Sequence, residues 1–360
     1  MKKRFQTRKG DELNLPVFFP DATRAVLRSL DSIDIANTKT PGLLVNTYHL
    51  YQEVGKRIIK EHGSVGKFMN WHGGIISDSG GFQVMTLAKS GKVKGSISDK
   101  GVTFRTHGKK TLFTPEKSIE YQSILDTDML VVLDDFTPPK ASRTEAQITV
   151  NRSLLWARRC KEKFENIYKG QKQKPYLLAV VQGGRYQDLR EDCTRELVKI
   201  GFDGLGYGGW PIDSKGYFDY ETAKTIANNS PENYLLYGLG IGKPEEIVNC
   251  VQLGYDIFDC VLPTRDARHG RLYVYTAKSI NDVDVTKNVF YKYYTPQKEM
   301  NFRSPERISP ACDCLLCANY TRSYLAHLFK IKDMSAMRLA SIHNLRFYSI
   351  LMEKLQESSS

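Results

Sequence analysis

The chain has 360 residues, of which 41% are hydrophobic, so it is long enough to bury a large core. Its 52 Lys and Arg against 40 Asp and Glu give a formal charge of +12, which favours a polyanionic partner such as nucleic acid. No apolar run is long enough to cross a bilayer, and Met1-Lys2-Lys3 opens no signal sequence, which excludes a membrane protein and predicts a cytoplasmic one.

A repeating pattern of short apolar runs follows a β-rich opening segment, residues 1–40, which is expected to pack on a larger domain. Seven such runs lie at residues 43–45, 75–78, 130–134, 177–182, 205–209, 234–238 and 257–259. Helix-compatible stretches separate most of them, and the clearest are residues 115–125, 143–166 and 186–200. This alternation predicts a parallel sheet whose strands are buried on both faces.

The alternation favours an α/β fold in which residues 41–285 form a (β/α)₈ TIM barrel, with a doubly wound sheet as the competing arrangement. The eighth strand is not obvious, and residues 272–275 are the candidate. Residues 89–114 are predicted to be an inserted β-hairpin that decorates or covers the barrel rim. Residues 286–360, which contain a cysteine cluster, are expected to form a separate subdomain with C-terminal helices.

Polar residues end several of the apolar runs. In a barrel of this type, catalytic side chains lie at the carboxyl ends of the strands. The residues at these ends are Asp78, Asp134, Gln182 and Asp259, and Gly209 ends a further run where a backbone amide could approach a ligand. One polar strand end is usually a structural cap, but four in register indicate a functional site.

Residues 255–270 carry the strongest single signal for chemistry. An apolar strand ends near Asp259, and Pro263 is expected to break the chain into a cationic loop with Arg265 and Arg268. A carboxylate beside such a loop can act as a nucleophile on a phosphate-bearing substrate. The alternative is a solvated loop in which Asp259 only forms a salt bridge.

The seven cysteines do not form a disulfide framework, because three of them gather on one short segment. Cys312, Cys314 and Cys317 suit tetrahedral coordination of Zn²⁺, and a closed shell with one histidine would be structural. His327 and His343 both follow the cluster, and their spacing does not choose between them. The alternative is three reduced cysteines that lie close together by chance.

Four motifs, taken together, carry a family resemblance. They are Ser77-Asp78-Ser79-Gly80-Gly81-Phe82-Gln83, Val181-Gln182-Gly183-Gly184, Phe258-Asp259-Cys260-Val261-Leu262-Pro263-Thr264-Arg265 and the Cys-x-Cys-x₂-Cys cluster. In these motifs the chain resembles the tRNA-guanine transglycosylases (queuine tRNA-ribosyltransferases) of the bacterial type, from about residue 7 to residue 355. The resemblance implies a (β/α)₈ TIM barrel with an inserted C-terminal zinc-binding subdomain.

The resemblance also implies a reaction in which a wobble guanine of tRNA is exchanged for a 7-deazaguanine base, preQ1 or queuine. The family nucleophile falls on Asp259, which would form a covalent ribosyl ester, and the proton acceptor falls on Asp78. The implied substrate-binding residues are Asp78, Ser79, Gly80, Gly81, Phe82, Asp134, Gln182 and Gly209. Among these, Phe82 would stack on the base, and carboxylate acceptors would select its N–H donors.

Further residues and partners are implied in the same way. The RNA contacts fall on Gly240, Ile241, Gly242, Lys243, Pro244, Glu245 and Glu246, and on Thr264, Arg265, Asp266, Ala267 and Arg268. The zinc ligands become Cys312, Cys314, Cys317 and His343, with one structural Zn²⁺ per chain. The partners are the tRNA anticodon loop, the free base and a second copy of the chain in a homodimer.

The chain departs from the bacterial pattern beside the expected base pocket. Trp210-Pro211-Ile212-Asp213-Ser214 replaces a segment that is Leu-Ala-Val-Gly-Glu in many members, and Asp135-Phe136 replaces Glu-Cys. The altered pocket could select a different 7-deazaguanine. Two other functions stay open: a non-catalytic RNA-binding subunit that pairs with an active homologue, and a relative that acts on DNA.

Overall fold

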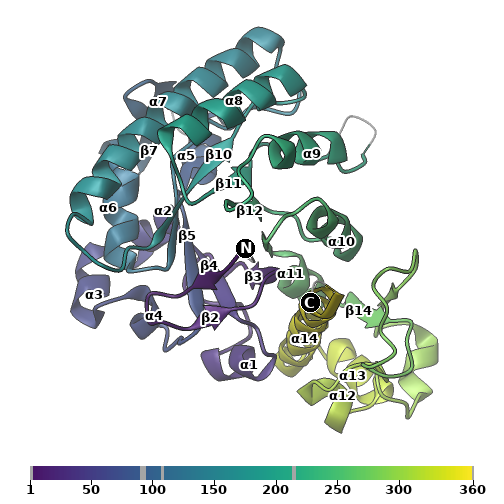
Figure 1. Cartoon of the computed structure of the whole chain (residues 1–360). Coiled ribbons are helices and arrows are strands. Elements are labelled where there is room, and N and C mark those ends of the chain that lie inside the picture. The colour runs from purple at the N-terminus through teal and green to yellow at the C-terminus, as the bar shows by residue number, and fades with distance from the viewer. Residues whose placement is uncertain (1–2, 90–94, 107–108, 213–215, 359–360) are drawn as a thin grey trace.

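A computed structural model describes residues 3–89, 95–106, 109–212 and 216–358 of the chain. Eight parallel strands form its central sheet, and helices surround them in an outer layer (Figure 1). The strands are β3 (Val17–Pro20), β4 (Gly42–Asn46), β5 (Gly74–Asp78), β9 (Met129–Val131), β10 (Tyr176–Val181), β11 (Gly204–Tyr207), β12 (Leu235–Gly238) and β13 (Ile257–Cys260). This arrangement confirms the predicted barrel and excludes the doubly wound sheet.

The seven apolar runs correspond to seven of these strands, but the predicted position of the eighth strand was wrong. The eighth strand is β3, which pairs in parallel with β13, and a bridge from Asp21 to Leu44 joins it to β4 and closes the ring. The candidate segment is instead β14 (Leu272–Tyr275), which pairs antiparallel with β15 (Tyr291–Tyr294) outside the barrel. An apolar, aromatic segment satisfies strand preferences in either place, so its composition could not tell the two apart.

The strands are buried on both faces because successive side chains point alternately into the barrel and toward the helices. Inside, Phe19, Ile76, Val131 and Val180 belong to one apolar cluster, which Phe5 joins. A larger cluster fills the space between the sheet and the helices. The barrel interior is therefore a packed core and not an open channel.

Helices follow the strands in chain order and form the outer layer (Figure 1). They are α1 (Ser32–Asn37), α2 (Thr47–Glu53), α3 (Gly55–His62), α4 (Val65–Phe68), α5 (Gly81–Lys89), α6 (Pro115–Leu125), α7 (Arg143–Ile167), α8 (Gln187–Ile200), α9 (Tyr220–Asn228), α10 (Pro244–Gln252) and α11 (Leu262–Arg268). The three clearest sequence predictions correspond to α6, α7 and α8. Local signals explain this agreement: α6 has Pro115 in its first turn, and α7 begins with a capping box between Ser142 and Glu145.

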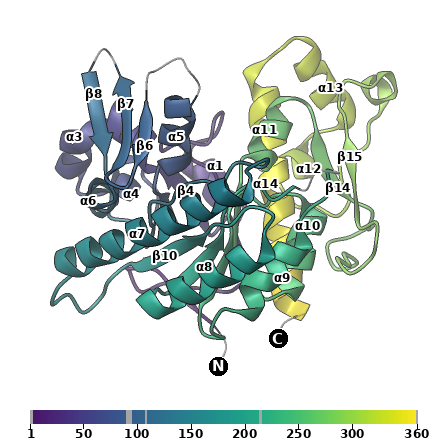
Figure 2. The same ribbon diagram turned by 90° about the horizontal axis from the view of Figure 1, so that it is seen from above.

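Two additions stand on opposite sides of the barrel mouth (Figure 2). The segment predicted as a hairpin contains a three-stranded antiparallel sheet of β6 (Ser96–Ser98), β7 (Gly101–Thr106) and β8 (Lys109–Phe113). Residues 90–94 and 107–108 of that prediction lie outside the described residues. On the other side, the β14–β15 pair is followed by η1 (Glu299–Arg303), α12 (Leu315–Asn319), α13 (Arg322–Lys330) and α14 (Met334–Ser358).

A short pair of strands, β1 (Phe5–Gln6) and β2 (Glu12–Leu13), lies at the amino end of the barrel. Phe5 stacks on Tyr176 with ring centroids 5.1 Å apart and covers the interior from below. The opposite end, where the carboxyl ends of the strands meet, remains open to a ligand. Within the described residues, no helix combines the length and the apolar character that a membrane span requires.

Candidate active site

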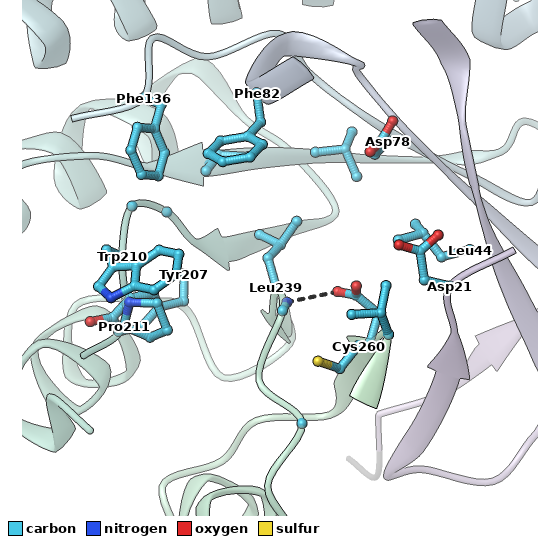
Figure 3. A pocket seen from close by; sticks show the side chains of 18 of the residues that line it. Asp21, Leu44, Asp78, Phe82, Phe136, Tyr207, Trp210, Pro211, Leu239 and Cys260 are labelled. Atoms are coloured by element: carbon cyan, nitrogen blue, oxygen red, sulfur yellow. Dashed lines mark hydrogen bonds between the residues drawn. The ribbon is translucent and has the colours of Figure 1, made fainter. Parts of the chain in front are cut away.

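A cavity of about 520 Å³, here called the barrel cavity, opens at the carboxyl ends of the strands. Side chains from β5, β9, β11 and β13 and from the loops that follow them line it, as does Asp21 just after β3. Figure 3 shows Phe82, Phe136 and Trp210 toward one side of this space and Asp21 and Asp78 toward the other. The cavity therefore has an aromatic side and a carboxylate side.

Asp259, the expected nucleophile, lies near the end of β13 and lines the barrel cavity. The backbone N–H of Gly240 donates a hydrogen bond to its Oδ1 at 2.9 Å (Figure 3). Burial raises the pKa of Asp259 to about 7, while this N–H and the neighbouring Tyr237 favour the ionised form. A substantial fraction of the carboxylate is therefore ionised at neutral pH and able to attack an electrophile.

Asp78 ends β5 on the same side of the cavity and is held by three donors. The side-chain amide of Asn46 donates to Oδ2 at 2.8 Å, and the backbone N–H groups of Thr47 and Gly80 donate to Oδ1 at 3.3 and 3.0 Å. Burial, together with the charge of Asp21, nevertheless raises the pKa of Asp78 to about 7. A fixed carboxyl group with this pKa can accept and return a proton near neutral pH.

The loop after β5 fits closely around Asp78. Gly80 has a φ of +72°, and an added Cβ would lie 2.9 Å from the backbone nitrogen of Tyr48, so the tight turn requires glycine. Ser79 and Gly81 line the cavity, and the Ser79 hydroxyl accepts a hydrogen bond from the Gly81 N–H at 3.2 Å. The Ser-Gly-Gly sequence therefore brings backbone close to any bound ligand.

Asp134 and Gln182 form a second polar pair, on the opposite arc of the barrel. Asp134 lines the cavity beyond β9, and Gln182 follows β10 and is fully buried behind it. Gln182 donates through Nε2 to Asp134 Oδ2 at 2.5 Å and accepts the Thr137 N–H through Oε1 at 3.0 Å. Burial raises the pKa of Asp134 to about 7, and the Gln182 donor opposes this rise. The pair thus presents a fixed acceptor to the cavity.

Gly209 and Phe82 border the same space. Gly209 has a φ of +86°, which an L side chain rarely adopts, and lines the cavity just after β11. Phe82, on the first turn of α5, is 48% exposed and meets Phe136 edge to face at 5.1 Å. Trp210 is 55% exposed on the neighbouring loop. Exposed aromatic rings in a cavity that also contains carboxylates suit a planar ligand such as a nucleobase.

The segment that departs from the bacterial pattern contributes directly to the cavity. Pro211 and Ile212 line it beside Trp210, whereas Asp213 and Ser214 lie outside the described residues. Asp135, the first residue of the other departure, is buried and bonded to Arg152, so the substitution that reaches the cavity there is Phe136.

The expected RNA contacts fall into two groups. Gly240, Gly242, Lys243, Glu246 and Arg265 line the barrel cavity, and Arg265 and Arg268 also line a smaller cavity beside it. Ile241, Pro244, Asp266 and Ala267 are buried in the protein interior. Thr264 is buried but lines the smaller cavity, and the exposed Glu245 accepts a hydrogen bond from the Tyr291 hydroxyl at 2.6 Å. The cationic side chains of the set are therefore the ones that a phosphate can reach.

The prediction of a cationic loop after Pro263 was wrong, because this segment is the helix α11. Pro263 stands in its first turn, where proline lacks only an N–H that would have no helical partner. Proline starts the helix here instead of ending the ordered chain. Arg265 and Arg268 are consequently held on one short helix.

Sequence reasoning missed three residues that shape the site. Asp21 lines the cavity after β3, in the segment expected only to pack on the barrel. Tyr237 on β12 is fully buried beside Asp259. Arg190 of α8 is also buried, and its guanidinium bonds the carbonyls of Gly208 at 2.7 Å and Val181 at 2.6 Å. A buried arginine on a helix gives no sequence signal, but a carboxylate just after an apolar run, as at Asp21, could have been noticed.

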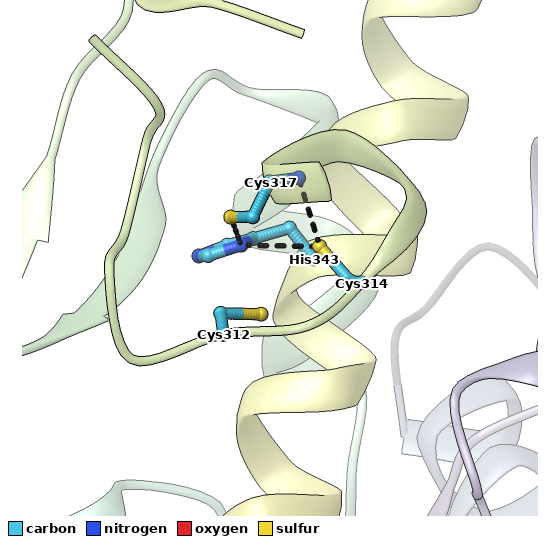
Figure 4. A group of neighbouring side chains, drawn as sticks. All are labelled: Cys312, Cys314, Cys317 and His343. Carbon is cyan, nitrogen blue, oxygen red and sulfur yellow. Dashed lines mark hydrogen bonds between the residues drawn. The ribbon is translucent and has the colours of Figure 1, made fainter. Parts of the chain in front are cut away.

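Cys312, Cys314, Cys317 and His343 come together in the C-terminal region (Figure 4). Their ligand atoms lie within 4.8 Å of one another, and all four residues are buried. His343 Nδ1 is 3.6 Å from Cys314 Sγ and 3.2 Å from Cys317 Sγ, near the roughly 3.5–3.8 Å edges of a tetrahedral zinc site.

The second nitrogen of His343 is also arranged for metal binding. Nε2 lies 2.8 Å from the carbonyl oxygen of Tyr273, so Nε2–H donates to this carbonyl and Nδ1 keeps its lone pair for the cluster. His327, the alternative ligand, is exposed on α13 and does not belong to the group. The residues therefore fit a bound metal ion, and His343 is the fourth member of the set.

Comparison with known proteins agrees with this geometry. The sequence model of the family described as "Queuine tRNA-ribosyltransferase" matches residues 3–358. A queuine tRNA-ribosyltransferase of Tolumonas auensis is 36% identical over 345 residues, covering 95% of this chain and 86% of the relative. One from Actinobacillus pleuropneumoniae is 37% identical over 358 residues, covering 98% and 87%. Because the match extends over nearly the whole chain at this identity, the chain belongs to the queuine tRNA-ribosyltransferase family.

Proposed function

We propose that the barrel cavity exchanges a guanine of tRNA for a free 7-deazaguanine base, with Asp259 as the nucleophile. Family membership makes the chain a tRNA-guanine transglycosylase of queuosine modification. The observation that supports the roles of these residues is that two sets of polar groups line opposite sides of one cavity. Asp259 and Asp78 line one side, and Asp134 and Gly209 line the arc of β9 to β11, where the buried Gln182 holds Asp134 from behind.

In the first step, Asp259 attacks C1′ of the wobble nucleotide and the bond from C1′ to N9 of guanine breaks. Guanine leaves with the bonding electron pair and takes up a proton, for which the neutral fraction of Asp78 is the source. A ribosyl ester on Asp259 remains. The Gly240 N–H keeps the nucleophile oriented before the attack.

In the second step, the incoming base loses its N9 proton to Asp78 and attacks C1′. The ester bond breaks, and its electron pair returns to Asp259 as the free carboxylate. Two displacements at one carbon retain its configuration, as in other double-displacement glycosyl transfers. Each carboxyl group ends the cycle in the state in which it began.

Base recognition follows from the opposite side of the cavity. Asp134 accepts hydrogen bonds through both oxygens while ionised, and the N–H donors of guanine or a 7-deazaguanine favour that form. Gln182 holds the carboxylate in place, and Phe82 can stack on the face of the base. A base that lacks these donors would leave buried acceptors unpaired, which provides the selectivity.

The tRNA is expected to reach the cavity over its cationic rim. Lys243 and Arg265 line the barrel cavity, and Arg268 lies close by on α11. Positive side chains at these positions can bind the phosphates on either side of an extruded base, in keeping with the net charge of +12. The incoming base is preQ1 or queuine, and the wall of Trp210, Pro211 and Ile212 faces its 7-substituent in this proposal.

The metal that best fits the Cys₃His group is Zn²⁺, with Cys312, Cys314, Cys317 and His343 as its ligands. Four protein ligands leave no position for water, so the ion would be structural. It would join the α12 loop to α14, whose residues also contact the strand β14. On the family resemblance, we further propose that the protein is cytoplasmic and forms a homodimer. Light scattering of the purified protein would test the homodimer.

The test of the reaction uses unmodified tRNA with a wobble guanine and radiolabelled guanine. We expect label to enter the tRNA and a protein–RNA species to survive denaturation. Asp259→Asn should abolish both while secondary structure and metal content remain unchanged. Asp192→Asn, an exposed carboxylate on α8, is the matched control and should behave as the wild type.

The same assay separates the competing functions. Retention of tRNA without any exchange would support a non-catalytic RNA-binding subunit. Incorporation into duplex DNA but not into tRNA would support a relative that acts on DNA. Undiminished exchange by Asp259→Asn would refute the role of Asp259. Comparison of guanine, preQ1 and queuine as incoming bases identifies the preferred one.

A further inference from the structure

Asp21 occupies a position in the barrel that gives it access to the reacting nucleotide. It follows β3 directly and bridges to Leu44 of β4. The strand order runs β13, β3, β4, β5, so Asp21 stands between the strand of Asp259 and the strand of Asp78. Burial raises the pKa of Asp21, and its charge in turn raises the pKa of both neighbours. The three carboxyl groups therefore border the same space.

Beside the barrel cavity lies a second cavity of about 280 Å³, here called the cationic cavity. Its basic lining residues are Arg24, Arg28, Arg265, Arg268 and His49, and Asp21 is its acidic residue. Burial and the neighbouring Arg28 and Arg265 lower the pKa of Arg268, which shows that these guanidinium groups lie close together. A cavity with this lining suits a phosphate group.

Asp21 lines both cavities, as do Arg265 and Val261. If a nucleobase occupies the aromatic side of the barrel cavity and a phosphate occupies the cationic cavity, the sugar that joins them lies at their border. The attack by Asp259 on C1′ requires the same placement, because C1′ must lie beside the nucleophile. Asp21 is the carboxylate at that border.

We propose that Asp21 accepts a hydrogen bond from the 2′-hydroxyl of the nucleotide whose base is exchanged, and so makes the enzyme prefer RNA to DNA. This inference rests on the proposed function. In a nucleotide inside a chain, O3′ and O5′ are esterified, so the 2′-hydroxyl is the one hydrogen-bond donor on the sugar. An ionised carboxylate is purely an acceptor. The donor and the acceptor therefore match.

The orientation of Asp21 is fixed before substrate arrives. The Thr23 hydroxyl donates to its Oδ1 at 2.6 Å, and a carboxylate keeps further acceptor sites after one such bond. A negative charge at this position opposes ionisation of Asp259 and Asp78, which the reaction needs. A hydrogen bond from Asp21 to the substrate would stabilise the bound nucleotide and so offset the unfavourable effect of its charge on Asp259 and Asp78.

The experiment compares two anticodon stem-loops that differ in one atom. One has guanosine at the wobble position, and the other has 2′-deoxyguanosine in an otherwise identical RNA. For the wild type, kcat/KM should favour the ribose form, and Asp21→Ala should reduce this preference roughly ten- to hundredfold. Removal of the Asp21 charge also acts on Asp259 and Asp78, but this effect is common to both substrates and cancels in the ratio. Because the intrinsic reactivity of each substrate is the same for both proteins, the ratio of preferences isolates the contact.

Asp21→Asn is the second variant, since it keeps the shape of the side chain and a neutral acceptor. It should reduce the preference by a smaller factor than Asp21→Ala, because a neutral acceptor forms a weaker hydrogen bond. Thr23→Val, which removes the hydroxyl that orients Asp21, should also reduce the preference for the ribose substrate. Circular dichroism and metal content establish that each variant is folded.

Two results would overturn the inference. If Asp21→Ala or Asp21→Asn changes kcat/KM for both substrates by the same factor, Asp21 acts through its charge alone, and the acid limb of the pH profile would shift with it. If the wild type shows no preference for ribose, no contact with the 2′-hydroxyl exists. A wild type that exchanges neither substrate would instead contradict the proposed function.

Discussion

The backbone N–H of Gly240 donates to Asp259 Oδ1 at 2.9 Å, which ties the loop after β12 to the end of β13. Gly240 has a φ of +72°, so this loop turns in a conformation that favours glycine, and Gly240 also lines the cavity. The donor holds one carboxylate oxygen and favours the ionised form. The same contact therefore orients the proposed nucleophile and favours its ionised form.

The reaction should depend on pH near neutrality. Burial raises the pKa of Asp259 and Asp78 to about 7, and the ionised form of each is the one that attacks C1′ or accepts the N9 proton. Between pH 8 and pH 6, kcat/KM should fall about tenfold if ionisation of Asp259 controls the rate. Because the first step uses neutral Asp78 as its proton source, the rate should also fall above pH 7 where that proton transfer is limiting. Initial rates across this range, at constant ionic strength, provide the measurement. A flat profile would contradict the assigned roles.

The buried carboxyl group of Asp259 should make the fold less stable at high pH. Because the folded pKa of Asp259 is raised, its contribution to stability is fully present below the unfolded value and is lost as the pH rises through about 7. Asp259→Asn should therefore increase the free energy of unfolding at pH 8, by up to about 4 kcal/mol for a shift of three pKa units.

Urea denaturation at pH 8 and pH 5 tests this prediction, and the gain should be smaller at pH 5. Asp192→Asn on the surface of α8 should show no such difference between the two pH values. Equal stability of Asp259→Asn and the wild type at pH 8 would mean that burial imposes no cost on the carboxylate.

Loss of Asp134 should weaken base recognition without unfolding the site. Asp134→Asn replaces an acceptor with an amide whose NH₂ group would face the N–H donors of the base. We expect kcat/KM for guanine exchange to fall on the order of a hundredfold. Binding of guanine by calorimetry should weaken in parallel. Unchanged binding would show that the base does not contact the pair of Asp134 and Gln182.

The metal site should stabilise the C-terminal region. Chelation, or His343→Ala, should release one metal ion per chain and lower the free energy of unfolding by several kcal/mol. His327→Ala is the matched control, because His327 is exposed on α13. It should keep the metal and change stability by less than about 0.5 kcal/mol. Metal analysis and thermal melts of the wild type, His343→Ala and His327→Ala test this prediction. Metal loss from His327→Ala would refute the ligand assignment.

The sequence predicted most of the barrel because the evidence for it is local. Seven apolar runs mark seven strands, and the helix α6 begins at its own Pro115. Local sequence patterns did not identify the eighth strand, β3. β3 has four residues and ends in Pro20, and its partner β13 lies near the other end of the barrel segment, so only the closed ring reveals the pairing.

In the candidate site too, residues marked by their local sequence were predicted, whereas a residue whose role depends on distant strands was missed. The polar ends of the apolar runs indicated Asp78, Asp134, Gln182 and Asp259, and all four lie at the carboxyl ends of the barrel strands. Asp21 was missed, because its importance depends on which strands neighbour β3. Its own sequence context is a short apolar run that ends in Pro20. The roles assigned to the expected residues remain predictions.

The helix α14 forms hydrogen bonds to backbone segments beside Asp259. Asn344 donates to the carbonyl of Pro263 at 2.9 Å, and the Tyr348 hydroxyl donates to the carbonyl of Gly242. These two backbone segments flank Asp259. During synthesis on the ribosome they therefore lack these partners until α14 has emerged, so the surroundings of Asp259 are completed only after all the barrel strands have been made.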